Sequence, residues 1–192
     1  MEEKIQSSDI RIERLLEEDY CYIENFSCGN ENLDAFFIQD VIKCIESHYV
    51  VAYCARLEHN NNIVAIFTLA NDAIILTNDA DSADFKEANY NVFPENYQRI
   101  FKEQSSYPAI NIAHLAVEKH YQDKGIGSNI IEYIISTFLE YDIAGCQLIT
   151  VDSLNNSRTN NFYSKNGFIN FTNSDSTSQT RRMYLILEQY RN

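Results

Sequence analysis

The pattern of apolar and polar positions divides the first part of the chain into a strand, a helix and a hairpin. Residues 10–16 (IRIERLL) alternate between the two kinds of side chain, which predicts a β-strand with one buried face. Residues 30–42 (NENLDAFFIQDVI) place apolar side chains at helical spacing behind an asparagine that can cap the helix. Two further apolar runs, 48–57 and 63–69, flank the polar segment 59–62, and we expect antiparallel strands joined by that loop.

The second half of the chain predicts a strand, a helix and a strand. Residues 108–117 (PAINIAHLAV) are apolar and β-branched, which suits a strand buried on at least one face. From Ile126 the apolar residues form two adjacent rows on one face of a long helix, Gly145 is its expected C-terminal cap, and residues 146–152 form a second buried strand. This order implies a parallel pair joined by a right-handed crossover. Residues 168–187 then predict a closing strand, polar loop and strand.

Residues 72–107 lack such a regular pattern. Acidic side chains are scattered among apolar ones, and a short helical pattern follows at residues 95–104. We interpret the segment as an insertion before the strand at 108–117. A surface flap is the simpler interpretation, and the alternative is a wall of a binding site whose carboxylates attract a cationic amine.

A turn with two glycines precedes the long helix. Its sequence is QDKGIGS, residues 122–128. Backbone N–H groups in the first turn of a helix have no intrahelical partner and lie at the positive end of the helix dipole. Gly125 and Gly127 remove Cβ atoms that would keep a phosphate away, and the side chains of Gln122, Lys124 and Ser128 could add donors or charge. The turn is therefore a candidate pyrophosphate site, and its alternative role is only to join strand to helix.

A second motif, Phe-Tyr-Ser-Lys-Asn-Gly-Phe, occupies residues 162–168. With the strand ending in Leu-Ala-Val and the Gln-x-x-Gly-x-Gly turn, it resembles the GNAT superfamily of N-acetyltransferases over roughly residues 110–187. The acetyl-CoA signature of that family reads Q/R-x-x-G-x-G/A. The resemblance implies an α/β (α+β) fold, with a central, mixed and mostly antiparallel sheet, splayed parallel strands at the acetyl-CoA site, and flanking helices. Length and composition predict a single domain, residues 1–192, which would contain the insertion at 72–107.

The resemblance further implies acetyl-CoA as the cosubstrate. The pantetheine arm would pair with the backbone of residues 115–117, where one N–H near a strand bulge could polarise the thioester carbonyl. Asn156 has the spacing from Phe162 of a family asparagine that contacts this arm, although the neighbouring Asn155 could take its place. The expected cofactor-binding residues are Leu115, Ala116, Val117, Gln122, Asp123, Lys124, Gly125, Ile126, Gly127, Ser128 and Asn156.

Three residues are candidates for catalysis. Aminolysis of a thioester gains from a general acid that protonates the leaving thiolate, and in the family the tyrosine of Phe-Tyr has this role, which transfers to Tyr163. Its alternative role is that of an anchored aromatic side chain. His114 and Glu118 are candidate general bases, since both flank the cofactor strand and would share one face of it unless a bulge intervenes. A single histidine in a strand is more often structural.

The segment 28–36 (CGNENLDAF) resembles the opening Cys-x-x-x-x-Leu-Asp-x-Phe of one GNAT branch that includes toxin acetyltransferases. Cys28 and Leu33 would also be suitable residues for simple packing in a core.

Charge limits the partners. The chain has 15 Lys and Arg against 28 Asp and Glu, a formal net charge of −13, which disfavours nucleic acid and anionic membranes without excluding tRNA at a local basic patch. Arg181 and Arg182 are interpreted as exposed strand-end charges, with an acidic partner as the alternative. A homodimer is also compatible with the closing hairpin.

Cysteine usage and hydropathy bear on location. The five cysteines include no Cys-x-x-Cys pair, and no histidines have zinc-ligand spacing, so we expect reduced thiols and no metal. The N-terminus lacks the apolar segment of a signal peptide, and the apolar runs are too short to span a bilayer. We therefore expect a cytoplasmic protein.

The function that these observations favour is N-acetylation of a primary amine by direct attack on acetyl-CoA in a ternary complex. Two alternatives remain. One is a toxin that acetylates aminoacyl-tRNA, and the other is a non-catalytic acyl-CoA-binding module on the same fold.

Overall fold

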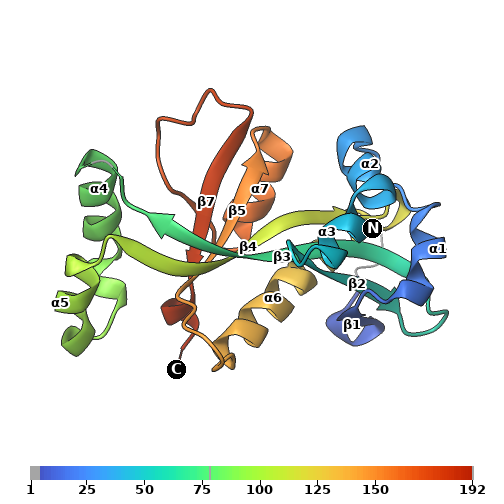
Figure 1. The fold of residues 1–192 in the computed structure, drawn as a ribbon, viewed down its shortest axis with the longest axis horizontal. Helices are drawn as coiled ribbons and strands as arrows, with labels where there is room; N and C mark the ends of the chain where they lie inside the picture. The colour runs from blue at the N-terminus through green and yellow to red at the C-terminus, as the bar shows by residue number, and fades with distance from the viewer. Residues whose placement is uncertain (1–4, 78, 192) are drawn as a thin grey trace. The chain divides into compact units, whose positions relative to one another are not determined.

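The computed structural model describes residues 5–77 and 79–191, and Figure 1 shows its elements. The helices are α1 (Tyr20–Ile23), α2 (Glu31–Gln39), α3 (Val41–Glu46), α4 (Asp79–Asn89), α5 (Glu95–Glu103), α6 (Ile126–Leu139) and α7 (Ser157–Lys165). The strands are β1 (Ile10–Arg14), β2 (Val51–Leu57), β3 (Ile63–Ile75), β4 (Ser106–Val117), β5 (Leu148–Leu154), β6 (Ile169–Asn170) and β7 (Thr180–Ile186). Two short 3₁₀ helices matter below, η4 (Lys119–Tyr121) and η5 (Leu187–Tyr190).

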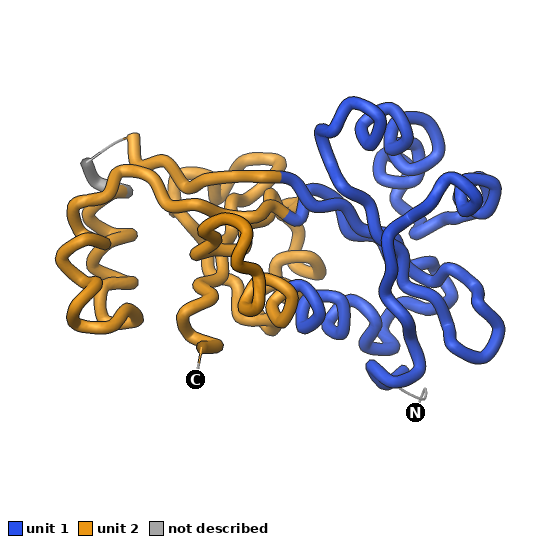
Figure 2. The backbone as a smooth tube through the Cα atoms, turned by 60° about the horizontal axis from the view of Figure 1, so that its bottom comes forward, with its two compact units in different colours: residues 1–70, 112–134 blue, residues 71–111, 135–192 orange. Residues whose placement is uncertain are grey.

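The chain contains two compact units, coloured separately in Figure 2. Residues 1–70 and 112–134 form the first unit, and residues 71–111 and 135–192 form the second. The elements β3, β4 and α6 each contribute residues to both.

The strands form a seven-stranded sheet in the order β1-β2-β3-β4-β5-β7-β6. The β1–β2, β2–β3, β5–β7 and β6–β7 pairs are antiparallel, and β4–β5 is parallel. The parallel ladder is short, because residues 109–111 pair with 148–150 although β4 continues to Val117 and β5 to Leu154. The mixed, mostly antiparallel sheet with one parallel pair that the sequence predicted is therefore confirmed.

The first unit has its own apolar core. Its buried members are Leu15, Ile23, Phe26, Phe37, Val41, Ala52, Cys54, Ile66 and Ala116. Burial raises the pKa of the Cys54 thiol to about 11, so this cysteine packs as a small neutral side chain.

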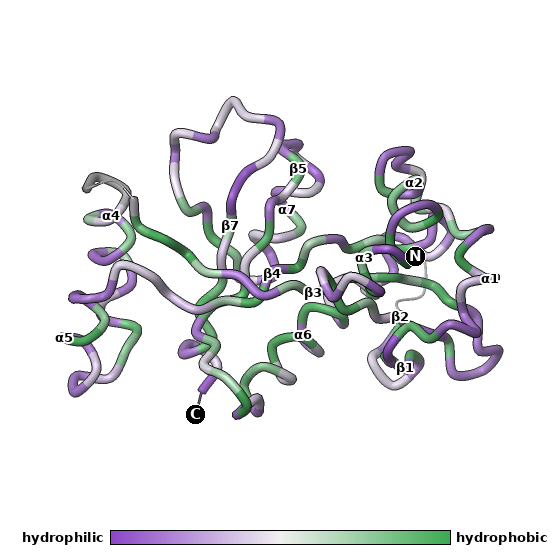
Figure 3. Tube along the Cα trace, viewed as in Figure 1, coloured by the Kyte–Doolittle hydropathy of each residue, from purple (hydrophilic) through white to green (hydrophobic). Residues whose placement is uncertain are grey.

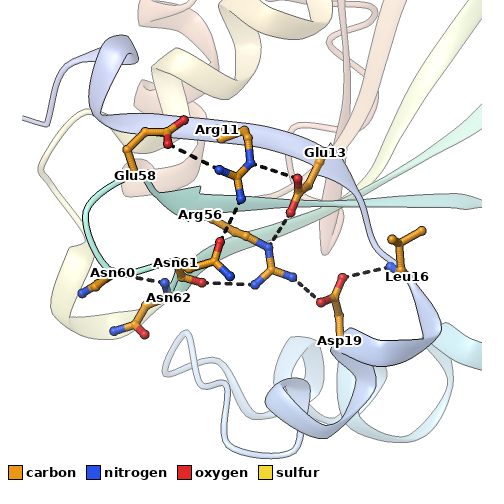
Figure 4. Close-up of polar contacts among 9 residues, drawn as sticks. All are labelled: Arg11, Glu13, Leu16, Asp19, Arg56, Glu58, Asn60, Asn61 and Asn62. Carbon is orange, nitrogen blue, oxygen red and sulfur yellow. Dashed lines mark hydrogen bonds and ion pairs between the residues drawn. The ribbon is translucent and has the colours of Figure 1, made fainter.

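A charged cluster joins β1 to β2 in the same unit (Figure 4). Arg56 is 5% exposed, its guanidinium pairs with Asp19, and its Nε donates to Glu13 Oε1 at 2.6 Å. Its Nη1 donates to the backbone carbonyl of Asn61 at 3.2 Å. Asp19 also accepts a hydrogen bond from the N–H of Leu16 at 3.0 Å. A buried ion pair is tolerated only when its polar atoms are hydrogen-bonded in this way.

The second unit has a core that is rich in aromatic side chains. Its buried members are Ile74, Phe85, Phe93, Phe101, Tyr107, Ala109, Leu148, Tyr184 and Ile186. Asn89 is 1% exposed, and its amide donates to the carbonyl of Phe85 at 2.6 Å and to the hydroxyl of Tyr184 at 2.8 Å. The amide thereby fixes the end of α4 to β7.

The segment 72–107 is more regular than its sequence indicated. β3 extends to Ile75, and two helices, α4 and α5, follow it. Phe85 and Phe101 of these helices lie in the core, which a loose surface flap would not provide. That the segment is an insertion stays a prediction.

Other boundaries differ from the sequence-based predictions. Asn30 caps α2 as expected, accepting from the N–H of Leu33 at 3.1 Å, but the chain breaks at Asp40 into two helices. Gly145 is not a helix cap, because α6 ends at Leu139, where its apolar rows end. β5 begins at Leu148 rather than at residue 146.

The two arginines at the start of β7 are also less exposed than expected. The side chains of Arg181 and Arg182 are 15% and 24% exposed and pair with Asp175 and Asp72. The interpretation of both as exposed strand-end charges is therefore wrong. Among the helices of the described residues, none has the length and apolar character needed to cross a membrane.

Candidate functional site

The glycine turn lies in the first unit, between η4 and α6. Asp123 and Gly125 have positive φ angles of 60° and 94°. Glycine adopts such angles readily and other residues rarely do. A Cβ atom at Gly125 would lie 3.5 Å from the carbonyl oxygen of Ile5, which is ordinary van der Waals contact. The need for glycine at this position therefore comes from the backbone angle rather than from lack of space.

The first turn of α6 presents N–H groups without partners. The N–H of Asn129 makes the first backbone bond, to the carbonyl of Gly125 at 3.1 Å. Within the described part of the chain, no residue accepts a hydrogen bond from the N–H groups of Ile126, Gly127 and Ser128. These donors lie at the positive end of the helix dipole. The residues present therefore fit the pyrophosphate of CoA.

The side chain of Gln122 holds the turn in place. Its Nε2 donates to the carbonyl of Val117 at 3.0 Å and to the carbonyl of Cys28 at 2.7 Å. The sequence suggested this amide as a phosphate donor, whereas these two bonds tie the turn to the end of β4 and to the segment before α2. Lys124 places its ammonium 5.4 Å from the centre of the Tyr121 ring, a cation–π contact.

Two residues that the sequence did not single out also hold the turn. The N–H of Ile5 donates to the carbonyl of Lys124 at 2.9 Å, and the carbonyl of Ile5 accepts from Asn129 Nδ2 at 3.2 Å. No local pattern could have revealed this contact, because Ile5 and Asn129 are 124 residues apart.

The cysteine motif at 28–36 supports the same region. Asp34 accepts from the N–H of Cys28 at 2.8 Å and from the hydroxyl of Ser27 at 2.7 Å. The carbonyl of Ser27 accepts from the N–H of Lys119 in η4 at 2.9 Å. Burial raises the pKa of the Cys28 thiol to about 11, so this residue packs as a neutral side chain. The motif thus supports the segment that leads into the turn.

Residues 115–117 form the end of β4. Ala116 is 2% exposed and belongs to the core of the first unit. Pairing of this backbone with pantetheine stays a prediction.

His114 is packed against an aromatic ring in β4. Its ring lies parallel to that of Phe36, with centroids 3.5 Å apart, and its Nδ1 is 2.9 Å from the hydroxyl oxygen of Thr68. Burial lowers the pKa of His114 to about 4, so the imidazole is neutral at neutral pH.

Glu118 lies beyond the end of β4 and caps η4. Its carboxylate accepts from the N–H of His120 at 2.8 Å and is 2.8 Å from Nδ1 of the same histidine. The two candidate bases therefore do not share a face of a regular strand.

Asn155 and Asn156 directly precede α7 in the second unit. Asn156 caps the helix, accepting from the N–H of Thr159 at 2.9 Å. Asn155 instead donates to the carbonyls of Ser176 and Ser178, at 2.9 and 2.8 Å, and holds the loop between β6 and β7. The predicted short helix with an asparagine cap is confirmed, and Gly167 follows its end with φ of 88°.

Tyr163 is a buried residue of α7. It is 6% exposed and packs edge-on against Phe162 and Phe168, with centroids 5.0 and 5.3 Å away. Burial raises the pKa of Tyr163 far above that of free tyrosine, so its hydroxyl keeps its proton. None of the described residues hydrogen-bonds to this hydroxyl. The hydroxyl is therefore available to a ligand.

Residues 88–170, a range that includes the turn, α6 and Tyr163, match the family model described as the acetyltransferase (GNAT) domain. The chain is similar to a GNAT acetyltransferase domain over these residues, which make up less than half of its 192 residues. This match supports acetyltransferase activity for the chain. A comparison with curated proteins finds no match.

Solved structures share the GNAT fold over nearly the whole chain. A tyrosine-to-phenylalanine mutant of KacT has a TM-score of 0.68 at 16% identity, with 95% of this chain and 99% of that chain covered. AtaTR bound with acetyl-CoA has a TM-score of 0.63 at 18% identity, with 94% and 95% covered. AtaT complexed with acetyl-methionyl-tRNA has a TM-score of 0.68 at 18% identity, with 95% and 97% covered. At these identities the similarity shows the fold alone.

Proposed function

We propose that the protein is a GNAT acetyltransferase that transfers the acetyl group of acetyl-CoA to a primary amine by direct attack in a ternary complex. The observation that carries the proposal is the turn at residues 122–128. Its positive φ at Gly125 and the N–H groups of Ile126, Gly127 and Ser128 form a site for the pyrophosphate. AtaTR, a similar structure, is bound with acetyl-CoA, which supports the assignment.

Tyr163 is proposed as the general acid. When bound, acetyl-CoA supplies the thioester, and a proton donor at the sulfur assists departure of the thiolate. A buried tyrosine with a raised pKa and no described partner can donate a hydrogen bond or a proton at neutral pH.

Both candidate bases remain proposals. A neutral His114 can accept a proton, but its lowered pKa makes it a weak base and its ring is stacked on Phe36. Glu118 is occupied by His120.

A second candidate function is acetylation of aminoacyl-tRNA. One observation favours this function. The fold of AtaT, whose structure is complexed with acetyl-methionyl-tRNA, matches this protein over 95% of the chain. The net charge of −13 weighs against it, since tRNA binding depends on contacts with phosphates. We further propose a cytoplasmic location, because the five cysteines are unpaired. Among the described residues, no group of side chains could hold a metal ion.

Calorimetric titration with acetyl-CoA tests the site. Gly125→Glu adds a charge and a side chain at the turn and should weaken binding by about 100-fold or more. Gly145→Glu is the matched control, because a Cβ at Gly145 has no neighbour within 4 Å. It should bind like the wild type. Gly125→Ala, which strains the backbone without adding charge, should bind with intermediate affinity. Equal affinity of Gly125→Glu and wild type would refute the site.

Release of free thiol then identifies the acceptor. Turnover with pooled primary amines would support the main proposal, and turnover only with charged tRNA would support the second. Binding of acetyl-CoA without turnover in either pool would instead indicate an acyl-CoA-binding module.

A further inference from the structure

In the second unit, the side chains on one face of the sheet change from apolar to polar or charged between neighbouring positions of that face, in both β5 and β7. Alternate residues of a strand point to the same face. Leu148 of β5 and Tyr184 of β7 belong to the apolar core, while Thr150 and Arg182 occupy the adjacent positions on the same face. Figure 3 shows the change along β7, from purple to green. Five residues from four strands form what is termed here the polar row: Asp72, Asn111, Thr150, Asp152 and Arg182.

The members of the polar row are bonded to one another. The hydroxyl of Thr150 donates to Asp72 Oδ2, and the guanidinium of Arg182 pairs with the same oxygen. Arg182 Nη1 donates to Asp152 Oδ2 at 2.7 Å, and Asn111 Nδ2 donates to Thr150 Oγ1 at 3.1 Å. The hydroxyl of Thr150 and two of the three guanidinium nitrogens of Arg182 are thus used within the row.

Two side-chain oxygens of the polar row accept no hydrogen bond from the described residues. Among the described residues, none donates a hydrogen bond to Asp72 Oδ1 or to Asn111 Oδ1. The side chains of Asp72 and Arg182 are 21% and 24% exposed, so a ligand can reach them. Two carboxylates face one guanidinium, which leaves an excess of negative charge.

Sheet stability alone does not account for the row. Partly buried charges lose hydration, and an apolar set of similar volume is often at least as stable. The neighbouring step on the same face is such an apolar set, covered by Phe85 and Phe101. Asn111 and Thr150 are also the last paired residues of the β4–β5 ladder, so the charges occur where regular pairing stops.

We propose that the polar row binds the ammonium group of the acceptor amine, with Asp72 Oδ1 and Asn111 Oδ1 as its hydrogen-bond acceptors. An alkylammonium has several N–H donors and one positive charge, which match the accepting oxygens and the excess negative charge. Neutral alcohols lack the charge, and anionic compounds are repelled. The inference rests on the proposed function, because it assigns residues that recognise the amine substrate of that reaction.

A titration of the whole chain with n-butylammonium in the absence of acetyl-CoA, monitored by ¹⁵N NMR, tests the polar row directly. The amide signals of Asp72, Thr150 and Arg182 should shift and saturate, whereas n-butanol, a neutral compound of similar size, should leave them unchanged. Asp72→Asn keeps an oxygen for Thr150 and Arg182 but removes the charge, and it should weaken binding about tenfold or more.

Glu103→Gln is the matched control for net charge, because Glu103 is an exposed residue of α5 whose carboxylate pairs with Arg99. It should bind n-butylammonium like the wild type. If Asp72→Asn does not fold, Asn111→Ala should show the weaker binding instead. Equal affinity in a folded Asp72→Asn variant, or equal shifts with n-butanol, would overturn the inference.

Turnover separates this inference from the proposed function. With an amine substrate, Asp72→Asn should raise KM about tenfold and leave the Kd of acetyl-CoA unchanged. An unchanged KM would overturn the row while the acetyltransferase proposal stands. Saturable binding of n-butylammonium at the row without any thiol release would support the row and count against the proposed function.

Discussion

Replacing Tyr163 by phenylalanine should separate catalysis from stability. The substitution removes one hydroxyl from a side chain that is 6% exposed and keeps the ring contacts with Phe162 and Phe168. Because no described residue bonds to that hydroxyl, no protein hydrogen bond is lost, and the free energy of unfolding should change by less than about 0.5 kcal/mol. A general acid typically contributes 10²–10⁴-fold, so kcat should fall by roughly that factor.

Tyr184→Phe is the matched control. Tyr184 is also a buried tyrosine, but its hydroxyl accepts from the amide of Asn89, which is 1% exposed. Losing that oxygen should cost about 1–3 kcal/mol and lower the Tm by about 2–10 °C, with little change in kcat. The two variants are therefore expected to show opposite effects on rate and on stability.

Thiol release under saturating acetyl-CoA measures kcat, calorimetry measures the Kd of acetyl-CoA, and circular dichroism on heating measures the Tm. Unchanged kcat in a folded Tyr163→Phe variant would refute the role of Tyr163. A large fall in its Tm would refute the structural reasoning, since it would mean that the hydroxyl does have a partner in the folded protein.

Two further perturbations test the packing of the first unit. The pKa of His114 is about 4 in the folded protein and 6.5 as its ordinary value, so stability is full above about pH 6.5 and is lost as the pH falls toward 4. The loss should reach about 2 kcal/mol at about pH 5 in urea titrations, and His114→Gln should abolish most of it; an equally steep loss in that variant would assign the effect to another group. Arg56→Leu leaves Asp19 buried without its partner and should lower the free energy of unfolding by about 3–5 kcal/mol. The double variant with Asp19→Asn should regain part of that loss. A loss below about 1 kcal/mol would mean that water replaces the arginine.

Local signals were sufficient for the elements that contain the site. The apolar rows of α6, the β-branched run of β4 and the asparagine cap of α7 are each fixed by neighbours within a few residues in sequence. The turn between β4 and α6 was predictable for the same reason, because Gly125 is needed for its backbone angle. The break between α2 and α3 at Asp40 was not predictable from the sequence, because it contains no glycine or proline.

Contacts between distant segments account for what the sequence did not reveal. The side-chain amide of Gln122 could donate a hydrogen bond to a phosphate, yet in the structure it donates to the carbonyl of Cys28, which is 94 positions away. Asp72 looked like one of several scattered acidic residues of an irregular segment, and its meeting with Arg182, 110 positions later, arises only from the order of the strands. Periodicity indicates which face of a strand a residue occupies but not which strand lies beside it.

The bonds of Ile5 to Lys124 and Asn129 have a consequence for synthesis on the ribosome. Ile5 is made about 120 residues before its partners Lys124 and Asn129. Until they emerge, Ile5 lacks these two partners, although the neighbouring strand β1 can already pair with β2. The contacts that hold the turn at 122–128 are therefore completed only after Asn129 has been made. Contacts of such long sequence separation form late and slowly. A nascent chain should therefore acquire its affinity for acetyl-CoA abruptly, after Asn129 has left the exit tunnel, rather than gradually as each strand is added.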